Sequence, residues 1–489
     1  MGGGSRLLVW LVLLVPAVGT AAERPNVVFF LVDDLGWTDL GCFGSSFYDT
    51  PHVDGLARSG MKFTNAYAAC PVCSPTRASI LSGKYPSRIG ITDYINAAGG
   101  NQPGKWRRNT RLLPSPYKDR MAHKEVTLAE ALKEAGYATF FAGKWHLGPE
   151  QFWPESQGFD VNQGGITRGG PYGGKKYFSP YGNPRLKDGP PGEHLPARLA
   201  NETVKFIEAN RKKPFLAYLS FYSVHTPLIA RADLRQKYLA KRKALDARAV
   251  AGEFSKREHN RRVRTLQAHA VYAGMVEAMD AAVGTVLAGL KRLGLEQNTV
   301  VFFMSDNGGL STSEGHPTSN LPLRGGKGWM YEGGIREPMI VRWPGVTTPG
   351  SQCKQVVTST DFYPTILEIS GLKPRPDQHR DGMSFVSLLQ GGTRDRGPVL
   401  WHYPHYGNQG GAPSGAVRDG RWKLIEWYED KRVELFDLES DIGESRDLAE
   451  GQPDRVRAMQ ATLHRMLKET GAVMPARNER FDKSKREGR

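Results

Sequence analysis

The chain has 489 residues, a length that allows a large core in either two domains or one large α/β domain. It contains four cysteines, a number that in an exported chain would ordinarily suggest two disulfides. The formal net charge is +16, but the basic residues are spread out and no nucleic-acid-binding module is visible. We therefore expect no nucleic-acid partner. The clusters at residues 241–243 and 261–264 are interpreted as solvated surface, and the charge favours a polyanionic glycan only weakly.

The amino terminus has the pattern of a secretory signal. Arg6 supplies a positive charge, residues 7–15 form an unbroken apolar run, and Thr20-Ala21-Ala22 offers small residues for cleavage. We predict a signal peptide at residues 1–22 and an exported protein, periplasmic or secreted. The run is too short to cross a bilayer and no later stretch is long and apolar enough, so we expect no membrane span. An uncleaved anchor is the alternative, which the small residues after Pro16 disfavour.

Strand-like and helix-like segments alternate through the middle of the chain, the pattern of a mostly parallel sheet covered by helices. Buried-strand patterns occur at residues 26–32, 137–142, 214–221 and 299–304, and helical patterns at residues 126–135 and about 265–293. Polar residues follow each of these strands, and ligand sites in such sheets form at the carboxyl ends of the strands. The side chains expected to converge there are Asp33, Asp34, Lys144, His146, His225, Asp306 and Asn307. Each of them alone suits an ordinary loop or cap, but their joint placement favours a site.

A short helix is predicted at residues 74–83. Ser74 and Pro75 suit its cap and first turn, and Gly83 ends it. Cys73 then lies at the helix amino terminus, where unpaired N–H groups and the helix dipole favour an anion or a developing negative charge. Arg77 falls on the same helix face one turn later. A lone cysteine in this position is usually a small buried residue, so the local pattern does not decide its role.

The character of the chain changes near its carboxyl terminus. A glycine-rich loop at residues 323–328 carries Lys327, and a helix begins near Asp361. From Pro398 the patterns indicate four antiparallel strands and a closing helix, at residues 399–403, 414–418, 422–428, 433–438 and 452–470. We place a boundary at about residue 390, which gives a main domain at 23–390 and a C-terminal subdomain at 391–475. A charged tail at 476–489 is expected to fray.

Several motifs, in this order along the chain, resemble those of the formylglycine-dependent (type I) sulfatases, an arylsulfatase family of the alkaline phosphatase superfamily. They are Val32-Asp33-Asp34-Leu35-Gly36, Cys73-Ser74-Pro75-Thr76-Arg77 with the following Ala78-Ser79-Ile80-Leu81-Ser82-Gly83, Gly143-Lys144-Trp145-His146-Leu147-Gly148, His225-Thr226-Pro227, Ser305-Asp306-Asn307-Gly308, Lys327 within its Gly-Gly-Lys-Gly loop, and residues 331–338. The resemblance extends from Asn26 to about Asp447. It implies a large α/β domain, whose mixed, mostly parallel sheet is sandwiched by helices, and a smaller C-terminal α+β domain with a short antiparallel sheet.

The resemblance also implies the chemistry, that of a sulfuric ester hydrolase. In this family the cysteine equivalent to Cys73 is oxidised after translation to Cα-formylglycine, which acts as its hydrate. That step requires a partner, a formylglycine-generating enzyme or an anaerobic sulfatase-maturating enzyme. The remaining cysteines, Cys42, Cys70 and Cys353, then permit at most one disulfide. Hard oxygen donors suit Ca²⁺ and not zinc; the implied calcium ligands are Asp33, Asp34, modified Cys73, Asp306 and Asn307.

The family pattern assigns a role to each remaining motif residue. Arg77 would hold the hydrate, and Lys144 and Lys327 would bind sulfate oxygens. His225 would protonate the leaving oxygen, whereas His146 would position the hydrate and help to eject sulfate through its second hydroxyl. Some members use an additional serine after the Lys-x-His motif, and no serine here aligns safely with it.

The substrate is less well defined by the sequence. Candidate substrate-binding residues lie in the loop after the calcium ligands, in the glycine-rich loop and in an aromatic run of the C-terminal subdomain: Glu314, His316, Arg324, His402 and His405. The polar loops and basic surface favour a sulfated carbohydrate over a small hydrophobic steroid sulfate, and an aryl sulfate is the other expected substrate. Two other functions remain open: a phosphodiesterase or phosphonate monoester hydrolase of the same superfamily, and a non-catalytic protein that binds sulfated glycans.

Overall fold

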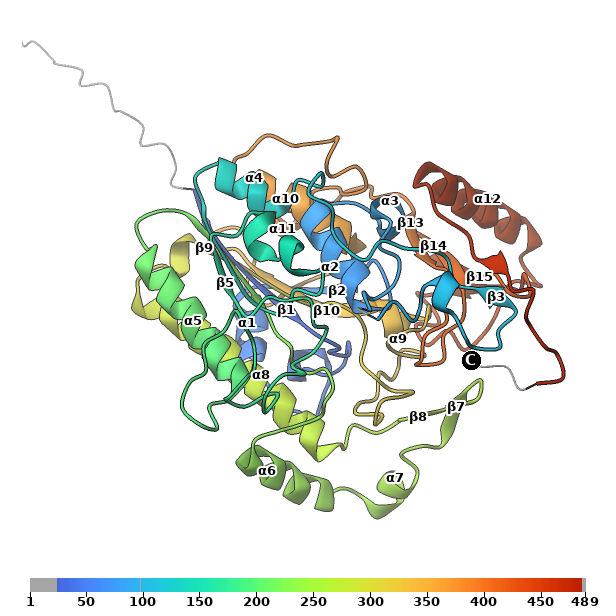
Figure 1. The fold of residues 1–489 in the computed structure, drawn as a ribbon, viewed down its shortest axis with the longest axis horizontal. Helices are drawn as coiled ribbons and strands as arrows, with labels where there is room; N and C mark the ends of the chain where they lie inside the picture. Colours follow the sequence, from blue (N-terminus) through green and yellow to red (C-terminus); the bar gives the residue numbers. More distant parts are fainter. Residues whose placement is uncertain (1–23, 97, 486–489) are drawn as a thin grey trace, which may run out of the picture.

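The computed structural model describes residues 24–96 and 98–485 (Figure 1). The predicted signal peptide at residues 1–22 lies outside them. A nine-stranded sheet with helices on both faces forms the main part of the chain, and a separate four-stranded sheet lies towards the carboxyl terminus. The α/β class and the two sheets predicted from the sequence are confirmed.

The large sheet is mixed and mostly parallel. Its order is β11-β2-β10-β9-β1-β6-β4-β5, with β12 also paired to β2. The strands are β1 Asn26–Val32, β2 Met61–Tyr67, β4 Ala138–Gly143, β5 Val161–Gln163, β6 Phe215–Ser220, β9 Thr299–Ser305, β10 Arg336–Arg342, β11 Ser351–Cys353 and β12 Val357–Thr358. Strands β9, β1, β6, β4 and β5 are parallel, whereas β10 is antiparallel to β9 and β2. The four strands predicted from the sequence agree with these bounds to within one residue at each end.

Strand β1 lies at the centre of this sheet because it is apolar on both faces. All seven of its residues are buried, as expected for a parallel strand covered on both sides. Val28, Phe30 and Val32 pack into one hydrophobic cluster, while Val27 and Phe29 pack into the other. The two clusters are the two halves of the main core, one on each face of the sheet.

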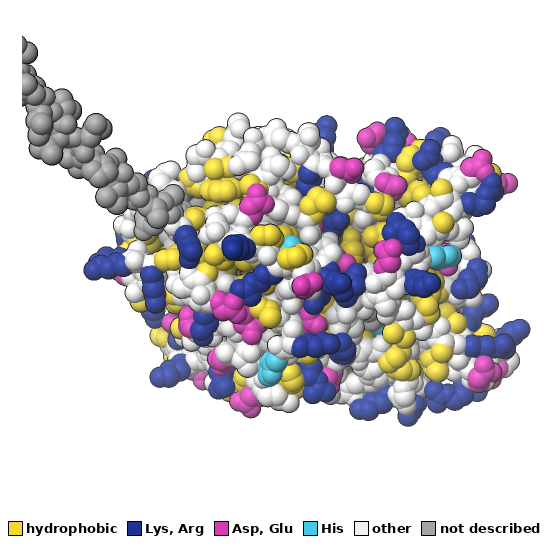
Figure 2. Space-filling view, turned by 90° about the horizontal axis from the view of Figure 1, so that it is seen from above, with side chains coloured by type: hydrophobic (Ala, Val, Ile, Leu, Met, Phe, Trp, Pro, Cys, Tyr) yellow, Lys and Arg dark blue, Asp and Glu magenta, His cyan; other side chains and the backbone are white. Residues whose placement is uncertain are grey.

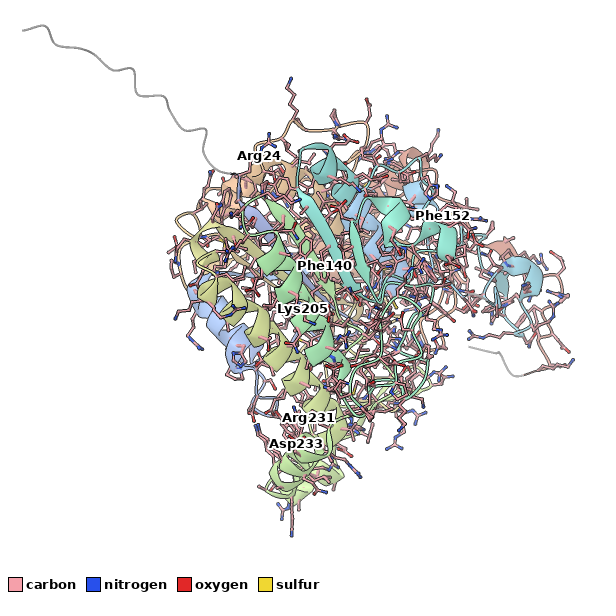
Figure 3. All side chains as sticks on the ribbon, turned by 60° about the vertical axis from the view of Figure 1, so that its left-hand side comes forward. Arg24, Phe140, Phe152, Lys205, Arg231 and Asp233 are labelled. Carbon is pink, nitrogen blue, oxygen red and sulfur yellow. The ribbon has the colours of Figure 1, made fainter. Side chains whose placement is uncertain are left out.

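Helices cover each face. The first cluster includes residues of α1 Pro51–Ser59, α5 Leu195–Ala209 and α8 Ala270–Arg292. The second includes residues of α2 Cys73–Ser82, α4 Leu128–Glu134, α10 Phe362–Ile369 and α11 Val386–Leu389. Figure 3 shows α5, labelled at Lys205, in front of the strand that carries Phe140, whose ring stacks on Phe206 of that helix.

Helix α8 is the one described segment that is long and apolar enough to cross a membrane. Of its most apolar window, 72% is buried within the fold, and it packs against α5 and α6. The core of the main domain therefore accounts for its apolar character.

The C-terminal sheet is antiparallel, as predicted. It consists of β13 Val399–Tyr403, β14 Ser414–Asp419, β15 Trp422–Trp427 and β16 Val433–Asp437, and α12 Pro453–Glu469 packs on it. A buried ion cluster joins it to the main domain, because Lys423 of β15 contacts both Glu332 of α9 Glu332–Ile335 and Glu444. The boundary near residue 390 is still a prediction.

The expectation of a frayed tail is wrong for its described part. Strand β17 Ala476–Arg477 pairs with β3 Leu112–Leu113. Asn478 is buried, and its side chain donates to Thr110 O. These backbone and side-chain bonds hold the segment against the loop at residues 109–113, which sequence composition does not reveal.

A basic arm, residues 231–264, connects the main domain to the vicinity of the C-terminal sheet. It contains α6 Ala232–Lys243, α7 Ala247–Ala251 and the hairpin of β7 Lys256–Glu258 and β8 Arg261–Val263, and it lies along the lower edge of Figure 1. In Figure 3 its first residues, Arg231 and Asp233, lie at the opposite end of the molecule from Arg24, which precedes β1. The arm is therefore on the side towards which the parallel strands run.

Candidate active site

A cavity of about 430 Å³ lies at the carboxyl ends of the central parallel strands. Five of the predicted site residues line it: Cys73, His146, His225, Glu314 and Lys327. The full lining is Cys73, Tyr94, Ile95, Asn96, His146, Thr167, Arg168, Gly169, Tyr172, His225, Glu314, Lys327, Asn408 and Gln409. The convergence predicted from the ends of four strands is thus present in the fold.

Cys73 is the first residue of α2, as expected from the turn that precedes the helix. Val72 is the N-cap residue in an extended conformation, so Ser74 does not cap the helix. Ser74 Oγ instead donates to His146 O and accepts from Ile95 N, which ties the helix to two cavity loops. Gly83 ends the helix at φ 69°, where a Cβ atom would lie 2.4 Å from His379 Cβ, and only glycine fits there without strain.

Arg77 lies beneath the cavity and is 2% exposed. Its Nε donates to Asp306 Oδ2 at 2.8 Å, and one terminal nitrogen donates to Lys144 O at 2.7 Å and to Ser220 Oγ at 2.6 Å. Burial would lower the pKa of its guanidinium, but Asp306 and Asp33 outweigh burial and raise that pKa further. Arg77 therefore stays charged and fixes the end of β9 against the end of β4.

Two lysines complete the charge balance of the site. Lys144 Nζ lies 2.6 Å from Asp33, and Lys327 Nζ lies 2.7 Å from Asp34. Burial would raise the pKa of Asp34, but Lys327, followed by His225 and Lys144, lowers it. Burial would lower the pKa of Lys144, but the charge of Asp33 outweighs burial and raises that pKa. Three carboxylates, with Asp306, thus face three cations in a buried cluster.

The donor set fits a hard divalent cation. Asp33 Oδ1 and Asn307 Oδ1 are buried and have no hydrogen-bond partner in the described chain. Asn307 Nδ2 donates to Asp34 Oδ1 at 2.7 Å, which places this amide beside the carboxylates. One ligand atom from each of Asp33, Asp34, Cys73 and His225 lies within 4.8 Å of the others. Oxygen atoms of this kind suit Ca²⁺.

The tautomer of His146 follows from its partner. Its Nε2 is 2.7 Å from Ile95 O, a carbonyl that only accepts, so Nε2 carries the proton and Nδ1 is left without a partner. Burial, and then the charge of Lys144, lower the pKa of this imidazole well below its usual value. Gly169 lies against the ring, where a Cβ atom would be 2.6 Å from Cε1. His146 is therefore a neutral side chain held rigidly.

His225 is oriented in a similar way. Its Nδ1 is 2.7 Å from Thr226 O, which assigns the proton to Nδ1 and leaves Nε2 as the basic nitrogen, 3.8 Å from Asp34 Oδ2. Burial and Lys327 lower its pKa well below the usual value, and Asp34 opposes them. The Tyr172 hydroxyl lies 3.4 Å from Nδ1, so this tyrosine covers the ring from the cavity side.

Cys73 is a neutral thiol here. Burial raises the pKa of this thiol to about 11, although Lys144 and Lys327 act in the opposite direction. A thiol that remains protonated is a poor nucleophile. All four cysteines of the chain are free, so none of the disulfides left open by the sequence is formed.

Of the predicted substrate-binding residues, only Glu314 lines the cavity. Its Oε1 accepts from Asn408 Nδ2 and Gln409 Nε2. His402 and His405 are buried in the C-terminal subdomain: His402 bonds to Tyr428 OH and Val473 O, and His405 to Thr92 Oγ1. The prediction that these two histidines bind substrate is therefore wrong, because they belong to the packed interior.

The other two candidates lie beside the cavity without lining it. His316 packs edge-on against Phe254, and its carbonyl accepts from Arg264 Nε. The Arg324 guanidinium pairs with Glu258 at 2.8 Å and stacks 3.8 Å from the ring centroid of Tyr331. Both side chains fasten the basic arm to the main domain.

Loop residues that the sequence did not single out make up much of the cavity wall. Tyr94 and Asn96 come from the loop after α3 Pro86–Ile89, and Arg168 and Tyr172 come from a glycine-rich loop. No serine is among the described residues lining the cavity, and Thr167 supplies the aliphatic hydroxyl there. The one available signal was Tyr172 itself, an aromatic residue flanked by glycines in the sequence.

Comparisons with known proteins show the family to which the chain belongs. A family model described as Sulfatase matches residues 25–372, and one described as N-sulphoglucosamine sulphohydrolase, C-terminal, matches residues 326–472. A sulfatase of Formosa agariphila is 33% identical over 89% of this chain and 86% of its own. N-acetylgalactosamine-6-sulfatase of Rattus norvegicus is 34% identical over 83% of this chain and 72% of its own. Steryl-sulfatase of the same organism is 31% identical over 78% of this chain and 73% of its own.

Solved structures show the same fold. The crystal structure of Ps i-CgsB in complex with k-i-k-neocarrahexaose has a TM-score of 0.72 and 28% identity, covering 92% of this chain and 93% of that chain. A phosphonate monoester hydrolase of Agrobacterium radiobacter has a TM-score of 0.62 at 20% identity, over 93% of this chain and all of that one. At that identity the second likeness concerns the fold alone.

Proposed function

Because the chain belongs to the sulfatase family and is a sulfuric ester hydrolase, we propose that it hydrolyses sulfate esters of a carbohydrate by means of a formylglycine made from Cys73. One observation carries the proposal: Cys73, His225 and Lys327 converge on one cavity. Lys144 lies next to them, and its ammonium group forms an ion pair with Asp33 at 2.6 Å.

The lining of the cavity supports a carbohydrate substrate. Asn96, Arg168, Asn408 and Gln409 supply amide and guanidinium groups that can bond to sugar hydroxyls. Tyr172 is 55% exposed at the rim, where a pyranose ring can stack on it. Relatives described as N-acetylgalactosamine-6-sulfatases act on a sugar sulfate by name, and Ps i-CgsB was solved with a carrageenan oligosaccharide. The steryl-sulfatase relative makes a steroid sulfate the alternative to test.

The chemistry requires an activated group at position 73. The unmodified thiol is buried and protonated at neutral pH, since its pKa is raised to about 11. The formylglycine hydrate supplies an oxygen nucleophile for sulfur and a second hydroxyl through which sulfate is released. A maturation enzyme of one of the two types implied by the family pattern would carry out the oxidation of Cys73.

The surrounding side chains have roles that follow from their geometry. Asp33, Asp34, Asp306 and Asn307 would hold Ca²⁺, which supplies positive charge for the sulfate oxygens. Lys144 and Lys327 are the ammonium groups nearest to Cys73 and would bind the same oxygens. His225, protonated on both ring nitrogens in the form that acts as the acid, would donate its Nε2 proton to the leaving oxygen, while the Nδ1–H bond to Thr226 O keeps Nε2 directed at the site.

The experiment begins with the mass of position 73. The tryptic peptide that contains Cys73 should be about 18 Da lighter than its thiol form in active protein, because a carbonyl oxygen replaces SH and H. Full activity of protein with only unmodified cysteine would overturn the mechanism. A panel of monosaccharides, each sulfated at one position, together with a steroid sulfate and a phosphonate monoester, then identifies the ester class.

We also propose that the protein is exported, on the strength of the amino-terminal signal pattern. Fractionation of producing cells, followed by amino-terminal sequencing of the exported protein, tests both the location and cleavage after Ala22. Full-length protein retained in the cytoplasm would contradict this proposal.

A further inference from the structure

The basic arm holds half of the net charge of the protein. Residues 231–264 contain 12 Lys and Arg residues and four Asp and Glu residues, a net +8 out of +16 for the whole chain. On the face shown in Figure 2, by contrast, Lys and Arg side chains are scattered with Asp and Glu among them. The charge excess is therefore concentrated in one segment.

The hairpin of this arm presents cations that are not neutralised. Several arm cations are paired, as Arg242 and Arg264 are with Glu253. Arg257 and Arg262 are exposed, and neither forms an ion pair with a carboxylate of the described chain; the Arg262 guanidinium lies over the Phe254 ring. These two charges are available to an anion in solvent.

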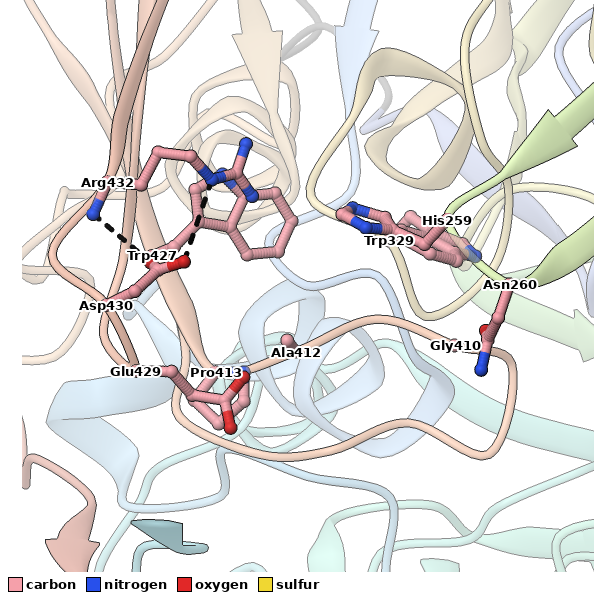
Figure 4. A pocket seen from close by; sticks show the side chains of 10 residues that line it. All are labelled: His259, Asn260, Trp329, Gly410, Ala412, Pro413, Trp427, Glu429, Asp430 and Arg432. Carbon is pink, nitrogen blue, oxygen red and sulfur yellow. Dashed lines mark hydrogen bonds and ion pairs between the residues drawn. The ribbon is translucent and has the colours of Figure 1, made fainter. Parts of the chain in front are cut away.

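The hairpin also forms one side of a second cavity, of about 290 Å³. His259 stacks on Trp329 with 5.6 Å between ring centroids, and Trp427 and Arg432 lie across the cavity from them (Figure 4). The carboxylates of Glu429 and Asp430, the amide of Asn260, and the residues Gly410, Ala412 and Pro413 form the rest of the lining. Aromatic rings beside a few polar groups are the composition of a carbohydrate site.

One loop separates this second cavity from the active site. Asn408 and Gln409 line the active-site cavity, whereas Gly410 lines the second. The loop is packed so closely that a Cβ atom on Gly410 would lie 2.6 Å from the Trp329 ring. Gln409 O also accepts from Thr312 Oγ1, which in turn accepts from Trp329 Nε1. The two cavities therefore share a thin, rigid wall.

From these observations, and resting on the proposed sulfatase activity, we propose that the second cavity and the basic hairpin form a further binding site for a sulfated polysaccharide. One sulfated unit of the polysaccharide occupies the active site. Another sugar unit of the same polysaccharide lies in the second cavity, against His259, and the sulfates next to that unit contact Arg257 and Arg262. The site serves polymeric substrates and is not needed for small esters.

Two variants test the two halves of this site. Arg257→Glu/Arg262→Glu reverses the exposed charges, and His259→Gly removes the stacked ring at a residue whose φ of 48° suits glycine. Lys212→Glu/Lys213→Glu is the matched control, since it makes the same charge change on an exposed turn at the amino end of β6. Each is made in the active protein and in a Cys73→Ser background, which allows binding to be measured without turnover.

Binding of chondroitin sulfate and dextran sulfate is measured at low and physiological salt, with neutral dextran and double-stranded DNA as further probes. We expect the arginine reversal to weaken binding of a sulfated polymer about tenfold at low salt, His259→Gly to weaken it about threefold, and the lysine control to change it less than about twofold. The kcat/KM for nitrophenyl sulfate should stay within about twofold in all three active variants, which also shows that they fold.

Arginine reversal with no larger effect than the lysine control would overturn the proposal. Equal affinity for DNA, with no effect of His259→Gly, would also overturn it and leave a non-specific polyanion surface. Failure of the proposed function is a different result: no sulfate ester is hydrolysed by the wild-type protein, while binding in the Cys73→Ser background still reports on this site.

Discussion

Replacing His225 and Lys327 separately by alanine distinguishes protonation of the leaving group from binding of the sulfate. Both side chains line the same cavity. His225 has its Nδ1 proton engaged by Thr226 O, so Nε2 is the atom that can exchange a proton with substrate. Lys327 lies 2.7 Å from Asp34 and contributes a charge that is independent of the leaving group. The two variants should therefore respond differently to leaving-group chemistry.

The expected magnitudes follow from these positions. General acid catalysis contributes about 10²–10⁴ in rate when the departing oxygen needs a proton. His225→Ala should lower kcat/KM by about that factor for a sulfated sugar, but by less than about tenfold for nitrophenyl sulfate, whose phenoxide leaves unaided. Loss of one preorganised charge typically costs about 10²–10³. Lys327→Ala should therefore lower kcat/KM by similar factors for both substrates.

The assay is kcat/KM for both substrates in wild type and both variants, with the ratios converted to transition-state free energies. Thermal unfolding serves as the control, because Lys327→Ala leaves the buried Asp34 carboxylate without its closest cation. Equal losses for the two leaving groups in His225→Ala would refute the acid role. The proton donor would then have to be sought at His146.

Three further predictions follow from the same contacts. Asn307→Ala removes an unpartnered buried oxygen without changing the charge, so we expect this variant to have a lower calcium content by elemental mass spectrometry. In wild-type protein stripped of metal by a chelator, Ca²⁺ and not Zn²⁺ should restore activity. Burial raises the pKa of Asp93 to about 7, so its contribution to stability falls as pH rises from about 4 to 7; Asp93→Asn should flatten the fall in Tm over that range. Lys423→Met leaves Glu332 and Glu444 buried without their shared cation and should cost about 3–5 kcal/mol in chemical denaturation; a loss under 1 kcal/mol would mean that the cluster does not join the domains.

The sequence predicts the sheet well because its central strands are stable in only one kind of environment, the interior of the fold. Strand β1 is apolar at every position after Asn26, and a segment of that kind is stable only when it is covered on both faces. Polar residues directly after such strands must then lie at one edge of the sheet, which is why Asp34 and Asp306 could be placed together across 272 residues of sequence. The helix after Cys73 was predictable for a similar local reason, since Gly83 ends it in a left-handed conformation.

The cavity wall was much harder to predict, because it consists of loops held by long-range contacts. Tyr172 reaches His225 from a loop about 50 residues earlier, and Gln409 meets Glu314 from the C-terminal subdomain. The sequence predicts substrate-binding histidines in the aromatic run at residues 401–406. In the fold, His402 and His405 are buried: His402 belongs to strand β13, with both ring nitrogens bonded to Tyr428 OH and Val473 O, and His405 Nε2 bonds to Thr92 Oγ1.

Charge shows most clearly how position adds to composition. The sequence gives +16 and several basic clusters, and without coordinates those clusters are equivalent stretches of solvated surface. The fold makes them unequal: Glu258 of the hairpin pairs with Arg324, which belongs to the same glycine-rich loop as Lys327, so the hairpin with Arg257 and Arg262 is fastened to a loop of the active site. Salt limits the reach of such charges to about 8 Å at physiological ionic strength. Lys212 and Lys213 lie at the other end of the sheet, before the amino end of β6. A surface charge therefore matters for substrate capture according to its distance from the cavity, and the salt dependence of polymer hydrolysis should follow the hairpin and not the net charge.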